Sequence, residues 1–246
     1  LLYDCRKKRL NQWLDELESG GLRISRSKTE YMYVNLAENT DDGGSLVLGD
    51  QVLPRVDKFK YLGSVLANDA SVDADLGHRI STGWMKWRQF TGVFCDRKMP
   101  PKLKGKLYQT VVRPCMLYGS ECRPANKTHD HKLHVAEMRM LRWSSGVTLR
   151  DRIRNEYIRG SLRVDNIADK LSEARLRWYG HVMRRPEDHL TRRVLKESER
   201  KRGPGRPPTT WLSTIKRDMK ARNLQDETIQ DRRSWRYFTR SANPST

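Results

Sequence analysis

Residues 73–94 read DADLGHRISTGWMKWRQFTGVF, and this stretch decides the fold class. Its large apolar residues recur three or four positions apart: Leu76, Ile80, Trp84, Trp87 and Phe90. That spacing places them on one face of an α-helix. The same period returns in later segments, namely residues 101–116, 132–143, 150–159, 167–185 and a last unit after residue 209. Most of the chain is therefore predicted to be helical.

The first 70 residues have a different pattern. Four apolar residues predict one amphipathic helix there: Leu10, Trp13, Leu14 and Leu17. Ser19-Gly20-Gly21 should end this helix, because glycine accepts the left-handed conformation of a C-cap. Strand-like runs follow at residues 30–36, 46–53 and 59–66, the second as a tight hairpin around Gly49-Asp50. The sequence thus predicts an α+β chain, mostly helical, that begins with a small antiparallel sheet.

Charge is distributed unevenly along the 246 residues, whose net charge is +19. Residues 1–75 hold 10 Lys/Arg and 13 Asp/Glu, whereas residues 76–246 hold 39 and 17. The whole basic excess therefore lies in the helical part. A surface of this kind attracts polyanions. A basic protein without such a partner, or one that touches anionic lipid, is the alternative. Aromatic residues between the basic ones favour nucleic acid.

The chain has no run of eighteen apolar residues and no signal-peptide pattern at its start. We expect a nuclear or cytoplasmic protein that is neither secreted nor membrane-spanning. The four cysteines lack the C-x-x-C spacing of a zinc site. His129, His131 and His134 follow Cys122, but histidines two positions apart do not share a helix face. Solvated histidines are favoured over a metal site, so no metal ligands are predicted.

Several phrases in the chain resemble the reverse transcriptases of non-LTR, LINE-type retrotransposons, in particular RTE-like ones. GLRISRSKTE at residues 21–30 resembles polymerase motif D, and FKYLGSVL at 59–66 resembles the primer-grip segment. RPCMLYGSE at 113–121 resembles the thumb phrase of these elements. Further matching phrases are MLRW at 140–143, DRIRN at 151–155, RLRWYGHVMR at 175–184, GRP at 205–207, Trp211 and DRRSWR at 231–236. Their order and spacing together make the resemblance specific.

Two departures from the family pattern stand out. Cys122-Arg123 follows the thumb phrase where the family usually has Thr-Trp. The aromatic-x-Asp-Asp motif is absent, since Asp41-Asp42 falls after motif D. In the family those carboxylates hold the metal ions of nucleotide transfer. We therefore expect this fragment to be inactive alone, with no cofactor of its own and Mg²⁺ only in the intact polymerase.

The resemblance also implies a division of the chain. Residues 1–70 would be the end of the palm, 71–145 a helical thumb, and 146–199 a helical C-terminal region. Residues 200–208 would be a basic flexible linker, and 209–246 a C-terminal helical unit. The expected partners are an RNA template and a DNA primer or target DNA. A non-enzymatic nucleic-acid-binding module, or a decayed remnant without selected function, is the alternative.

Three residues of the palm-like part are candidates for a role in catalysis or primer binding. Lys28 would protonate the leaving pyrophosphate as a general acid, or else be a solvated lysine in a surface ion pair. Tyr61 and Gly63 would bind the primer backbone, which glycine allows to approach closely. A plain strand with one face in the core is the alternative, and it is favoured for Leu62.

In the helical part, five basic residues are predicted to contact phosphates: Lys102, Lys104, Lys106, Arg139 and Arg142. For Trp84, Trp87 and Trp143, core packing is favoured over base stacking. The segment RGPGRP at residues 202–207, which contains Arg202 and Arg206, resembles the core of an AT-hook. The arginines of an AT-hook enter the minor groove of A·T tracts. A flexible basic linker is the favoured interpretation of that segment.

Overall fold

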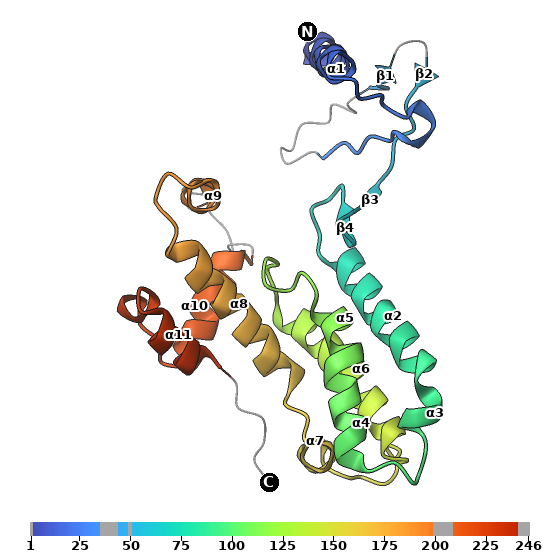
Figure 1. Cartoon of the computed structure of the whole chain (residues 1–246), viewed down its shortest axis with the longest axis vertical. Coiled ribbons are helices and arrows are strands. Elements are labelled where there is room, and N and C mark those ends of the chain that lie inside the picture. The colour runs from blue at the N-terminus through green and yellow to red at the C-terminus, as the bar shows by residue number, and fades with distance from the viewer. Residues whose placement is uncertain (1, 35–43, 49–50, 199–208, 241–246) are drawn as a thin grey trace. The chain divides into compact units, whose positions relative to one another are not determined.

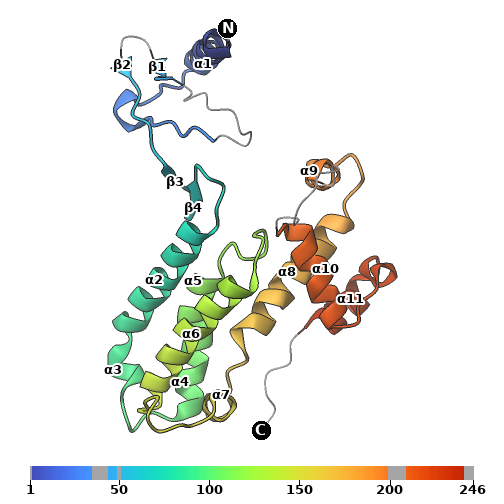
Figure 2. The same ribbon diagram turned by 180° about the vertical axis from the view of Figure 1, so that it is seen from behind.

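The computed structural model describes residues 2–34, 44–48, 51–198 and 209–240. The chain forms two compact units, Leu1–Asp75 and Leu76–Thr246, and each is considered by itself. Figures 1 and 2 show that helices make up most of the described chain, with small strands only near its start. The predicted α+β, mostly helical class is confirmed.

The first unit begins with α1, Leu2–Ser19, as predicted. The helix ends in a Schellman motif: the Leu22 N–H donates to the Leu17 carbonyl (2.9 Å) and the Gly21 N–H to the Glu18 carbonyl (3.0 Å). Gly21 has a φ of 80°, which explains why glycine stands there. A 3₁₀ turn, Arg26–Lys28, follows.

Two antiparallel hairpins complete this unit. β1 (Val47–Leu48) pairs with β2 (Gln51–Val52), which confirms the first predicted hairpin. β3 (Lys58–Tyr61) pairs with β4 (Ser64–Ala67), with Tyr61 opposite Ser64. The prediction of one strand over residues 59–66 is therefore wrong, because the chain reverses at residues 62 and 63.

That reversal is a two-residue turn in which both central residues have positive φ, 47° at Leu62 and 82° at Gly63. This is the backbone of a type I′ hairpin turn, whose twist matches the flanking strands. Leu62 is 74% exposed, so the expectation that it lies in a core is wrong. A strand over residues 30–36 is also absent up to residue 34, where only a single bridge joins Tyr31 to Arg55. Residues 35 and 36 lie outside the described chain.

The second unit is helical. Its elements are α2 (Asp73–Gln89, which starts in the first unit), α3 (Thr91–Phe94), α4 (Pro101–Leu107), a π-helix (Tyr108–Val112), α5 (Arg113–Leu117), α6 (Lys127–Ser144), α7 (Asn155–Leu162), α8 (Ile167–Met183), α9 (Leu190–Ser198), α10 (Trp211–Ala221), a 3₁₀ helix (Asp226–Ile229) and α11 (Arg232–Thr239). The predicted helices are present, although α7 starts five residues later than expected. α9 was not predicted. None of the described helices combines the length and the hydropathy that a membrane-spanning segment requires.

Two apolar cores hold the second unit together. The first joins α2 to α7 and the start of α8, around buried Trp87, Phe94, Tyr108, Met116 and Met140. The second joins α8, α10 and α11 around Leu176, Ile215 and Trp235. α8 contributes to both, so it ties the C-terminal helices to the rest (Figure 1). The domain boundaries predicted within this unit stay predictions.

A buried carboxylate joins four segments inside the first core. The Glu137 side chain is fully buried on α6. It accepts from the Tyr108 hydroxyl (3.1 Å) and from Arg113 (3.0 Å), and it pairs with Arg159 (3.5 Å). The Ile167 N–H at the start of α8 donates to it as well (3.2 Å). Burial, and then the charge of Glu137, raise the pKa of the Tyr108 phenol well above its usual 10.0, so the phenol stays a donor.

Candidate nucleic-acid interface

Trp143, near the end of α6, is the most exposed of the three tryptophans of the predicted thumb, at 61%. Its ring packs edge-on against Trp84 (5.9 Å between centroids) and Trp87 (5.5 Å) of α2. Trp87 is buried and stacks on Phe94. Core packing therefore describes Trp87 but not Trp143. Because one edge is fixed by α2, the exposed part of Trp143 forms a rigid aromatic surface.

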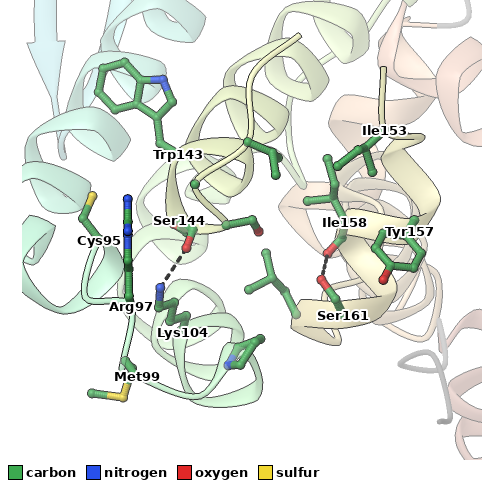
Figure 3. A pocket seen from close by; sticks show the side chains of 15 residues that line it. Cys95, Arg97, Met99, Lys104, Trp143, Ser144, Ile153, Tyr157, Ile158 and Ser161 are labelled. Carbon is green, nitrogen blue, oxygen red and sulfur yellow. Dashed lines mark hydrogen bonds between the residues drawn. The ribbon is translucent and has the colours of Figure 1, made fainter. Parts of the chain in front are cut away.

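Two hollows adjoin this tryptophan, and it lines both. One, of about 900 Å³, lies between α2, α6 and the segment 147–150. The other, of about 640 Å³, lies between the segment 95–101, α6 and α7 (Figure 3). In Figure 3 Cys95, Arg97 and Met99 border one side of it, and Ile153, Tyr157 and Ser161 the other. Trp143 and Val147 are common to both hollows.

Exposed arginines surround the tryptophan. Arg88, Arg139 and Arg150 line the first hollow, and Arg97 lines the second. In the part of the chain that the structure describes, none of the four makes an ion pair. We call Trp143 and these four arginines the Trp143 face. It combines uncompensated positive charge with an aromatic ring, and this combination suits phosphates and bases.

Two of the five predicted phosphate-binding side chains are buried and donate hydrogen bonds to the protein's own carbonyl groups. Lys104 is 7% exposed, and its Nζ donates to the Ser144 carbonyl at the end of α6 (2.8 Å), the bond drawn in Figure 3. Arg142 is 8% exposed and donates to the Ile153 carbonyl (2.8 Å) and the Asn155 side chain (2.8 Å). Both cations satisfy carbonyl groups that would otherwise be buried without a donor. Their prediction as free phosphate contacts is corrected to a structural role.

The other predicted residues of the helical part remain accessible. Lys102 and Lys106 are exposed on α4, and Arg139 is exposed on α6. Arg202 and Arg206 lie outside the described residues. A phosphate-binding role for Lys102, Lys106 and Arg139 stays a prediction, but their positions allow it.

The candidates of the first unit lie at exposed turns. Lys28 is exposed at the end of the 3₁₀ turn, and its N–H donates to the Ser25 carbonyl (3.1 Å). Tyr61 is 57% exposed at the end of β3. Gly63 supplies the positive φ of the hairpin turn, and this alone accounts for a glycine there. A polymerase role for these residues stays a prediction.

Sequence reasoning missed Arg88, Arg97 and Arg150 as members of the face. A signal was present for Arg88, and the same signal accompanies Arg139, which was predicted. Arg88 follows Trp84 by four positions, and Arg139 precedes Trp143 by four. Residues four apart on a helix lie next to each other, so each pair predicts a shared basic and aromatic surface. Arg97 and Arg150 lie in loops, where the sequence gives no such spacing.

Metal ligation has no support in the described ranges, where no group of three or more His, Cys, Asp or Glu side chains could hold a metal ion. Cys95, Cys115 and Cys122 are free thiols. The His134 Nδ1 instead accepts a hydrogen bond from Arg159 (2.9 Å) beside the buried Glu137. The binding of Mg²⁺ by an intact polymerase stays a prediction.

Comparison with known proteins gives two relatives. A transposon-derived protein of Caenorhabditis elegans is 24% identical over 241 residues, which cover 93% of this chain and 86% of that protein. The RNA-directed DNA polymerase from the mobile element jockey of Drosophila funebris is 24% identical over 223 residues. This match covers 88% of the chain but only 23% of the polymerase. The chain is of transposon-derived origin. No protein-family model and no solved structure matches it.

Proposed function

We propose that this retrotransposon-related chain binds an RNA–DNA template–primer through the Trp143 face, as the thumb-containing part of a LINE-type reverse transcriptase. The observation that carries the proposal is the exposed ring of Trp143 between two hollows, bordered by four arginines that make no ion pair with any described residue. Phosphates stabilise guanidinium groups that have no carboxylate partner, because two phosphate oxygens can accept two parallel N–H hydrogen bonds from one guanidinium group.

The geometry favours contacts with the phosphates and sugars of the nucleic acid over sequence-specific contacts with its bases. The four arginines come from α2, α6 and two loops, so they present charge over a broad surface. An RNA–DNA hybrid is close to A-form, and proteins recognise such helices by phosphates, sugars and shape. Trp143 would pack on a sugar or on an unpaired base at the duplex end. We therefore expect little sequence preference.

The relationship with the jockey polymerase supports an RNA-copying parent, since that relative is named as an RNA-directed DNA polymerase. The present sequence lacks an aromatic-x-Asp-Asp segment. Without paired carboxylates, the metal ions that activate the primer hydroxyl have no ligands. In this proposal the 246 residues bind template–primer and do not extend it.

A second candidate function is a nucleic-acid-binding module without an enzyme role. The observation that favours it is the match over 86% of the transposon-derived relative, which is of similar length. Such a module would not require an RNA–DNA hybrid. A clear preference for A·T-rich DNA duplex over hybrid would favour the module over the polymerase fragment.

The arginines of the Trp143 face give a direct test. We expect Arg139→Gln with Arg150→Gln to reduce the slope of log affinity against log salt concentration by about 1.8, since each phosphate contact contributes about 0.9 on a duplex. The measurement is fluorescence anisotropy of a labelled hybrid. A matched control is Lys127→Gln with Lys216→Gln, which removes two exposed charges outside both hollows. Equal slopes for the two double variants would contradict the proposal.

A further inference from the structure

A second basic cleft, of about 830 Å³, lies between α5, α8 and α11. It shares no lining residue with the hollows at Trp143. Two of the phrases noted in the sequence meet here, residues 175–184 on α8 and residues 231–236 at the start of α11. They are about fifty residues apart in the chain, and Figure 2 shows α8 and α11 packed together.

A glycine and a tryptophan fix the two helices in contact. The Trp235 indole N–H on α11 donates to the Leu176 carbonyl on α8 (2.9 Å). A side chain at Gly180 would overlap the Trp235 ring, so only glycine allows this approach. Trp235 is buried, at 2% exposure. The cleft therefore has rigid walls, which suits a binding site.

Arginine dominates the lining. Five arginines and one lysine face two glutamates: Arg177, Arg184, Arg232, Arg236, Arg240, Lys170, Glu121 and Glu173. Glu173 is already engaged by Lys170 (3.1 Å) and Arg177 (2.8 Å). Among the described residues, the other four arginines make no ion pair with a carboxylate.

The positive charges in the cleft act on one another. Arg184 donates to the Ile229 carbonyl (2.9 Å), which uses one of its five N–H donors. Burial, and then the charge of Arg232, lower the pKa of Arg184. The two guanidinium charges repel each other. An anion between them would remove this repulsion.

Aromatic rings complete the cleft. Tyr118 is 53% exposed, and Arg79 stacks on its ring at 4.5 Å. Trp178 is half-buried, with its ring 5.5 Å from that of the exposed His181. Rings beside unpaired arginines suit bases and phosphates of one flexible strand better than a rigid duplex.

We propose that the cleft between α5, α8 and α11 is a second nucleic-acid site, which binds a single-stranded segment through Arg184, Arg232, Arg236 and Arg240. Bases of that segment stack on Tyr118 or Trp178. The inference rests on the proposed nucleic-acid-binding function and extends it. The Trp143 face would bind the duplex, and the cleft would bind an unpaired strand, either single-stranded template RNA or the displaced DNA strand.

The test uses the whole chain and two labelled probes, a single-stranded RNA and an RNA–DNA hybrid. Arg232→Gln with Arg236→Gln alters two exposed side chains of α11. We expect roughly tenfold weaker binding of the single strand and a salt slope lower by about 1.4, since a single-strand phosphate contact contributes about 0.7. The control is Arg233→Gln with Lys216→Gln, also exposed but outside the cleft. Unchanged thermal unfolding of both variants establishes that folding is intact.

Outcomes for the two proposals are separable. Loss of single-strand binding by the cleft variant, with hybrid binding kept, supports the second site. Equal single-strand affinity in the cleft variant and its control overturns the second site, while hybrid binding that depends on Arg139 and Arg150 still supports the Trp143 face. Competition with an unlabelled DNA single strand distinguishes the two sources of the segment. If the DNA displaces the labelled RNA, the cleft accepts a displaced DNA strand; if only unlabelled RNA does so, the cleft binds template RNA.

Discussion

Glu137→Gln is expected to lower the free energy of unfolding by about 3–5 kcal/mol, the usual cost of removing one partner from a buried ion pair. The substitution keeps the side-chain volume but removes the only negative charge that contacts both Arg113 (3.0 Å) and Arg159 (3.5 Å) within the described chain. Two buried guanidinium groups would then lack compensation. Urea unfolding followed by circular dichroism measures the change as a shift in midpoint at constant slope.

The control for this prediction is Glu156→Gln, an exposed glutamate in the first turn of α7. Exposed substitutions of this kind usually stay within about 0.5 kcal/mol. If both variants unfolded at the same urea concentration, Glu137 would not be the centre that joins the π-helix, α5, α7 and α8.

Gly105→Ala is the second large effect, because α4 and α7 touch at this glycine. An added Cβ would overlap the Leu162 carbonyl and lie 3.2 Å from Val164. Backbone cannot move aside as a flexible side chain can, so we expect a loss of about 3 kcal/mol, at the upper end of overpacking. Thermal unfolding measures it.

Gly160→Ala is the matched control for Gly105→Ala, because Gly160 is in α7 and a Cβ there would meet nothing within 4 Å. Alanine is the better helix former by about 0.5–1 kcal/mol, so this variant should be slightly more stable. Opposite signs for the two glycines are the expected result. A neutral Gly105→Ala would mean that α4 and α7 are farther apart than the structure places them.

The helices were predictable from the sequence where one apolar face is continuous. Leu76, Ile80, Trp84 and Trp87 predicted α2, and Pro101 marked the first residue of α4. Pro114 lies at the start of α5, and a π-helix ends two residues before it. Proline cannot donate the usual backbone bond, and the wider turn accommodates this.

The second hairpin was not predictable in the same way. Its turn is Leu62-Gly63, whereas the common signals for a two-residue turn are Asn-Gly and Asp-Gly. Leucine rarely adopts positive φ, so the apolar run from Phe59 to Leu66 read as one strand. α9 was missed for a related reason: Leu190, Val194 and Leu195 offer few apolar residues among many charges.

The candidate site was predicted only in part. Five basic residues of the helical part were predicted to contact phosphates, and Arg139 is exposed, as such a contact requires. Lys104 and Arg142 are not free to do so, because Lys104 donates to the Ser144 carbonyl, 40 residues away, and Arg142 donates to the Ile153 carbonyl, 11 residues away. The periodicity of apolar residues shows which helix face is buried, but it does not show which lysine or arginine donates to a buried carbonyl group. Tertiary contacts alone separate the structural cations from the free ones.

The most direct test of the central claim is the affinity of the unaltered 246-residue chain for a labelled RNA–DNA hybrid across a salt series. The four arginines of the Trp143 face, which make no ion pair within the described chain, predict that log affinity falls against log salt with a slope of roughly −3.6 or steeper, since each phosphate contact contributes about 0.9. Such a slope, with similar affinity for hybrids of unrelated sequence, would support the account. An affinity independent of salt, or no binding at low salt, would contradict it.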